Sequence, residues 1–125
     1  MKLLLIITTF LIYNFSQSQN NFKGVGFQKD ILEYWDLELT SLNDNNYQVE
    51  YPNIPCTANW IFIKKEKNYK MYKEELTSGF DNCKNSGIIL VMNDDKSSNT
   101  KRFYIYDKEE DLEPYAFGFL QLIVE

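Results

Sequence analysis

Histidine is absent from the 125 residues, so the sequence lacks the commonest metal ligand and the usual general base of proteins. Ser-His-Asp and Cys-His catalysis are excluded with it. The two cysteines are not spaced as Cys-x-x-Cys, and two cysteines without histidine make a poor zinc site. Gly24-Val25-Gly26 lacks the third glycine of a nucleotide-binding loop. We therefore expect no metal, no other cofactor and no enzyme activity.

Positive charge is also scarce. Lysine and arginine number 13 against 18 acidic residues, and the net charge is −5. The longest basic cluster, residues 64–67, is interrupted by Glu66. Binding to a phosphate backbone relies on a basic surface, commonly with aromatic side chains among the charges. We therefore expect no nucleic-acid partner.

Long hydrophobic runs are missing except at the N-terminus. Lys2 precedes the apolar residues 3–12, an order typical of a secretory signal peptide. The run is too short for a membrane-spanning helix, which needs about 20 apolar residues. Ser16 and Ser18 provide the small side chains that signal peptidase requires, which predicts cleavage after Ser18. The mature protein would then be periplasmic or secreted, without a membrane anchor.

The expected domain organisation has three parts. Residues 1–18 form the signal peptide, and residues 19–28 form a mature N-terminal segment that begins with polar residues. Residues 29–125 form a single antiparallel β domain, because their number suits one domain.

Helical spacing is not sustained after the signal, and strict alternation takes its place. Trp35, Leu37 and Leu39 alternate with polar residues, which predicts a strand with these three side chains on one face. A second alternating run spans 47–51 and ends at Pro52. Further strands are expected at 58–63, 69–76, 88–92, 103–106 and 115–124. The fold class is therefore all-β, a seven- to eight-stranded antiparallel meander that closes as a small barrel or a sandwich.

Cys56 and Cys83 are expected to form a disulfide. If successive strands alternate in direction, the loops that contain these residues lie at the same end of the sheet. An even pair of cysteines in an exported chain is most simply a disulfide. In the chain-entropy model, closing a loop of about 28 residues stabilises a domain by roughly 3 to 4 kcal/mol.

Short motifs in the chain resemble those of small exported bacterial β domains that contain a disulfide. They are Cys56-x-x-x-Trp60, Tyr72-x-Glu74-x-Leu76-x-x-Gly79 and Cys83 with the apolar run after it. The resemblance covers residues 22–125 and implies the fold without a particular activity. The chain has Ala58 and Phe22 where the pattern has glycine and tryptophan.

The expected architecture is also similar to calycin barrels such as lipocalins and avidins, which bind small ligands. The Gly-x-Trp signature of those families is absent, since residues 24–27 read Gly-Val-Gly-Phe. Their ligands are therefore not carried over to this chain.

Paired acids offer a hydrolase as one alternative function. Asp36 with Glu38, or Glu74 with Glu75, could provide two carboxyl groups for acid-base chemistry. Acids that alternate with apolar residues along a strand are more typical of its solvated face.

Without evident catalytic residues, the chain is expected to be an exported, non-catalytic binding or interaction domain. Tyr104, Tyr106, Phe117 and Phe119 are the candidate recognition residues, on two strands that are expected to form a recognition edge. The acidic segment at 107–113 beside them favours a basic partner. The alternative is a calycin-like carrier of a small apolar ligand. A carrier predicts an enclosed apolar cavity, whereas a protein-binding module predicts a filled core and an exposed aromatic patch.

Overall fold

The computed structural model describes residues 21–83, 87–93 and 99–123. The expected signal peptide and its cleavage site lie outside the described residues. The elements are β1 (Phe22–Gln28), β2 (Glu33–Ser41), the 3₁₀ turn η1 (Asn43–Asn45), β3 (Tyr47–Tyr51), β4 (Cys56–Lys65), β5 (Tyr69–Ser78), β6 (Ile88–Met92), β7 (Thr100–Tyr106) and β8 (Ala116–Leu122).

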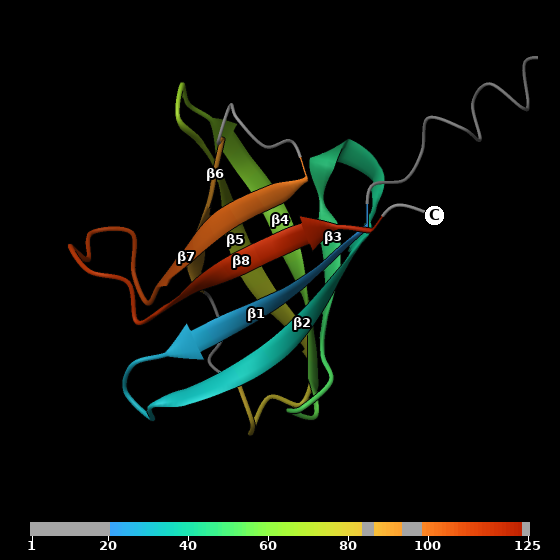
Figure 1. The fold of residues 1–125 in the computed structure, drawn as a ribbon, viewed down its shortest axis with the longest axis vertical. Coiled ribbons are helices and arrows are strands. Elements are labelled where there is room, and N and C mark those ends of the chain that lie inside the picture. The colour runs from blue at the N-terminus through green and yellow to red at the C-terminus, as the bar shows by residue number, and fades with distance from the viewer. Residues whose placement is uncertain (1–20, 84–86, 94–98, 124–125) are drawn as a thin grey trace, which may run out of the picture.

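The eight strands form a closed antiparallel barrel in which each strand pairs with its neighbours in the sequence and β8 pairs with β1 (Figure 1). The all-β meander is confirmed, and the open choice between barrel and sandwich is decided for the barrel. Closure removes the exposed edges that an open sheet would leave. Within the described segments, no helix has the length and apolar character needed to cross a membrane.

Strand β1 corrects the expected domain boundary. Residues 22–28, predicted to precede the β domain, pair along their whole length with β2 on one side and β8 on the other. The domain therefore begins before residue 29. The two glycines of β1 obscure this strand in the sequence, because glycine lowers strand propensity.

We call the pairing of β1 with β8 the closing seam of the barrel. Glycines on both of these strands have a packing role there. A Cβ atom on Gly26 would lie 2.5 Å from the indole ring of Trp35. Gly118 of β8 lies directly across from Gly26, and its Cβ would meet the backbone of Val25. The large ring of Trp35 can thus pack against the seam because the seam has no side chains there.

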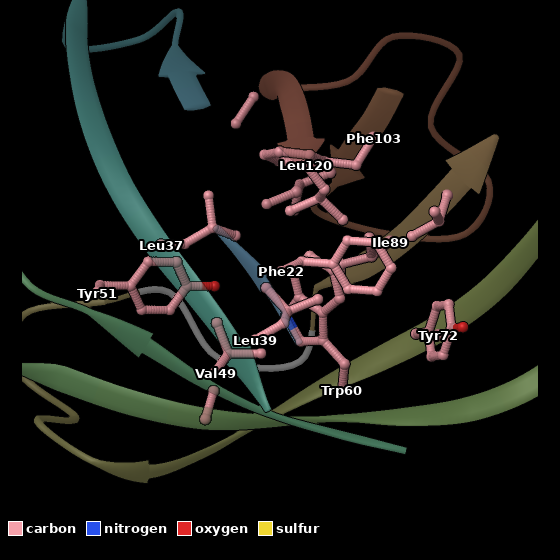
Figure 2. Close-up of a cluster of buried hydrophobic side chains, with 14 of the residues drawn as sticks. Phe22, Leu37, Leu39, Val49, Tyr51, Trp60, Tyr72, Ile89, Phe103 and Leu120 are labelled. Carbon is pink, nitrogen blue, oxygen red and sulfur yellow. The ribbon is translucent and has the colours of Figure 1, made fainter. Parts of the chain in front are cut away.

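Alternation places one side of each strand in a filled interior. The predicted inward residues Trp35, Leu37 and Leu39 are all buried. Trp60 and Phe103 lie at the centre of the core, with their ring centroids 6.0 Å apart (Figure 2). The middle of the barrel is therefore occupied by side chains.

One end of the barrel carries the disulfide, and we call it the disulfide end. The connections β1–β2, β3–β4, β5–β6 and β7–β8 meet there because the strands alternate in direction. Cys56 at the start of β4 is bonded to Cys83, with their Cα atoms 6.4 Å apart. The predicted disulfide is confirmed, and it is compatible with an oxidising, extracytoplasmic environment.

Candidate functional site

The four predicted recognition residues all lie on the outer side of the barrel. Phe117 is 38% exposed and Phe119 is 58% exposed, whereas Tyr104 and Tyr106 are half-buried. Their sequence neighbours on β7 and β8 occupy the core instead.

The structure brings together three of these residues. Tyr104 pairs across strands with Phe117, and Phe119 follows on the same side of β8. Phe27 of β1 extends the group, with its ring centroid 5.8 Å from that of Phe117. We call Phe27, Tyr104, Phe117 and Phe119 the aromatic face. It is a face and not a sheet edge, because β7 and β8 are paired on both sides.

Tyr106 lies apart from the aromatic face, in a separate surface concavity. It lines a concavity of about 280 Å³ with residues of β5, β6 and the β7–β8 loop, among them Tyr69, Leu90 and Leu112. The predicted group of four is therefore divided between two surfaces.

A pocket of about 220 Å³ opens at the disulfide end. Three aromatic side chains, Trp35, Tyr51 and Tyr115, line it with the apolar Ile54 and Ile105. Glu74 lines the same pocket, and no described lining residue is basic. The pocket thus combines aromatic and aliphatic walls with the amide side chains of Gln28 and Asn82 and one carboxyl group.

Glu74 comes from the inward side of β5. It is only 3% exposed, whereas its neighbour Glu75 is exposed. The expectation that this acidic pair lies on a solvated face is wrong for Glu74. The sequence did contain the signal, because Glu74 alternates with Tyr72 and Leu76, both of which are buried.

The two glutamates point to opposite sides of β5, so they do not form the acid-base pair that a hydrolase would need. The other candidate pair, Asp36 and Glu38, lies on β2, where Glu38 forms an ion pair with Lys23 at 3.7 Å on the surface. Among the described residues, no three cysteine or acidic side chains converge to hold a metal ion.

Two core residues donate hydrogen bonds to Glu74. Trp60 Nε1 lies 2.9 Å from Glu74 Oε2, and the Tyr51 hydroxyl donates to the same oxygen. These donors come from β4 and β3, which the register places side by side. A carboxylate has about four acceptor positions, so these two bonds do not saturate the group.

Burial raises the pKa of Glu74, and the hydrogen bonds from Tyr51 and Trp60 oppose this rise. Burial and the nearby Glu74 carboxyl raise the pKa of Tyr51 well above its usual value. Tyr51 therefore keeps its proton and acts as a donor to Glu74 at neutral pH.

The aromatic walls of the pocket are held in place by their own contacts. Trp35 Nε1 donates to Gln28 Oε1 at 3.2 Å, and the Trp35 ring packs edge-on against Tyr51 with centroids 5.4 Å apart. Such contacts orient the rings before any ligand arrives.

The pKa of Tyr115 is affected by the charged groups around the pocket opening. Its pKa is raised first by burial and then by the negative charges of Glu74, Asp107 and Asp30. Acidic groups from β5 and from the loops around the opening therefore act on the same tyrosine. This field favours positive charge in the pocket.

Comparison with protein-family models, with curated proteins and with solved structures finds no significant match. The structure is a small barrel that contains a disulfide, which is consistent with the resemblances to exported bacterial β domains and to calycin barrels. Membership of either family is not confirmed.

Proposed function

We propose that this chain is an exported, non-catalytic binding domain that takes a small ligand into the pocket at the disulfide end. The observation that carries the proposal is the position of Glu74, which is almost fully buried and yet lines an aromatic-walled pocket. Burying a carboxyl group is costly, and a few polar groups within a mainly apolar pocket are typical of ligand sites.

The filled core limits the size of the ligand. The volume of about 220 Å³ is below the range of roughly 300 to 1,000 Å³ common for pockets that bind drug-sized molecules. The polar group within the pocket also argues against a purely apolar cargo, since Glu74 would then lose contact with water without a new partner. A small ligand with a polar group fits better than the apolar ligand of a calycin-like carrier.

The two tryptophans provide a direct test. The chain has only Trp35 and Trp60, so two indole N–H signals are expected in a ¹⁵N NMR spectrum. Trp35 lines the pocket and Trp60 is bonded to Glu74. A screen of small aromatic and aliphatic fragments should shift both signals in a saturable manner.

A Trp35→Ala variant should lose this binding, while Phe119→Ala on the outer wall should retain it. Fragments that shift only signals from the outside of the barrel would contradict the proposal.

A second function is favoured by the aromatic face. Phe119 borders an outer groove of about 520 Å³ over β1, β2 and β8, whose charged lining residues are acidic on balance: Asp36, Glu38 and the Lys23 that pairs with Glu38. Exposed aromatic side chains next to acids suit a basic partner protein. The double variant Tyr104→Ala/Phe117→Ala should weaken salt-sensitive binding of a basic partner without altering the circular dichroism spectrum. Unchanged binding would assign these rings to packing alone.

A further inference from the structure

We propose that the ligand of the disulfide-end pocket carries a cationic amino group, which pairs with the Glu74 carboxylate between the rings of Trp35, Tyr51 and Tyr115. This inference rests on the proposed function and adds the chemical class of the ligand.

The first argument is the arrangement of the donors around Glu74. Tyr51 and Trp60 donate from the core and hold the carboxyl group in place through Oε2. A carboxylate this deeply buried is stabilised by a cationic partner, and neither of these two described donors carries a charge. An ammonium group in the pocket supplies a positive charge and further N–H donors.

The second argument is the chemistry of the walls. Trp35, Tyr51 and Tyr115 are aromatic, and cations bind favourably over the faces of such rings. The described lining includes no lysine or arginine that would neutralise Glu74 from within the protein. An anionic ligand would instead meet Glu74 together with the negative charges of Asp30 and Asp107 that act on Tyr115.

Binding should depend on pH in a defined direction. The groups that face Glu74 are Tyr51 from β3, Trp60 from β4 and Tyr115 directly before β8, with Asp30 and Asp107 acting at the opening. Burial raises the pKa of Glu74, so a proton competes with the cation when the pH falls. Affinity for an amine should therefore decrease as the pH is lowered from 8 to 5, whereas a neutral ligand should show little change.

The experiment compares matched probes on the full domain. Benzylamine, 2-phenylethylamine and cyclohexylamine are each titrated beside the corresponding alcohol, and benzoate serves as the anionic probe. The chemical shifts of the Trp35 and Trp60 indole groups report binding. We expect each amine to bind about 30-fold more tightly than its alcohol, as expected for a desolvated charge pair, and benzoate not to bind.

Two variants each replace one glutamate of β5 by uncharged glutamine, Glu74 on the inward side or Glu75 on the outward side. Glu74→Gln should reduce amine affinity by about 30-fold and leave the alcohols nearly unaffected, whereas Glu75→Gln should change neither. The comparison of amines with alcohols on the unaltered protein needs no variant, so it still decides the question if Glu74→Gln does not fold.

The outcomes separate the two proposals. If alcohols shift both indole signals as strongly as amines, or if benzoate binds best, the pocket binds ligands but the cationic class is wrong. If no probe of any class shifts the Trp35 signal, the proposed ligand pocket fails as well.

Discussion

Glu74 and its neighbour Glu75 show how two identical side chains can have different environments. Glu74 and Glu75 have the same side chain, but strand geometry turns one into the core and the other into solvent. Burial of Glu74 is stabilised by hydrogen bonds that Tyr51 and Trp60 donate to its carboxyl group. Two residues with equal chemistry therefore have different consequences when they are changed.

We expect Glu74→Ala to destabilise the domain by about 2 to 4 kcal/mol, because it leaves the buried Tyr51 hydroxyl and Trp60 N–H without their acceptor. Glu75→Ala, the matched control, should change stability by less than about 0.5 kcal/mol, since its side chain is exposed. Urea unfolding at pH 7 measures both values. Equal effects would show that the buried hydrogen bonds contribute little.

The raised pKa of Glu74 predicts how stability depends on pH. The folded state binds this proton more tightly than the unfolded state, so Glu74 stabilises the fold relatively more at low pH. As the pH rises from the unfolded value, near 4.3, through the raised folded value, this contribution is lost. The stability of the unaltered protein relative to Glu74→Gln should therefore fall over that interval. Thermal unfolding of both proteins from pH 4 to pH 8 tests this, and a difference that rises with pH would contradict it.

At the scale of the elements, β1 and β8 form the closing seam of the barrel. Alternation of apolar and polar residues predicted β2 and β3 well, because one side of each strand faces the core. It did not predict β1, whose pattern is broken by glycines. Gly26 is explained by Trp35 of the neighbouring strand β2, and Gly24 by β8, since a Cβ atom there would collide with the Phe119 carbonyl oxygen.

We expect Gly118→Ala to destabilise the domain by about 2 kcal/mol or more, because the new methyl group would collide with the backbone of β1. Gly87→Ala is the matched control. Its added Cβ would lie 3.3 Å from the Tyr106 carbonyl oxygen, which a small shift can relieve. Chemical unfolding of both variants measures the difference, and similar costs would show that the seam tolerates side chains.

At the scale of the whole molecule, the disulfide joins the start of β4 to the segment after β5 and so borders the candidate pocket. Cys56→Ser should lower the free energy of unfolding by about 3 kcal/mol and leave Cys83 as a free thiol. Reductant should produce a similar loss in the unaltered protein and none in the Cys56→Ser/Cys83→Ser variant. Equal thermal stability with and without reductant would contradict a structural role.

Processing of the N-terminus is a second property of the whole chain. We expect exported protein to begin at Gln19, because Ser16 and Ser18 match the preference of signal peptidase. Intact-mass measurement of material recovered from outside the cytoplasm tests this. Retention of residues 1–18 would show that the apolar segment serves another purpose.

The sequence by itself determined seven of the eight strands and the faces of most of these, because side-chain alternation is a local property of an extended backbone. It also determined the disulfide, since two cysteines in loops at the same end of a meander can meet without moving a strand.

The tertiary structure alone decided closure into a barrel, the inclusion of β1 and the assembly of the pocket. Glu74, Tyr51 and Trp60 lie on three different strands, and the loops around them approach from separate parts of the chain. Whether such residues meet depends on the register and twist of all eight strands together. A local pattern contains no record of those long-range pairings, so alternation along β5 can indicate the inward direction of Glu74 but not its hydrogen bonds to Tyr51 and Trp60.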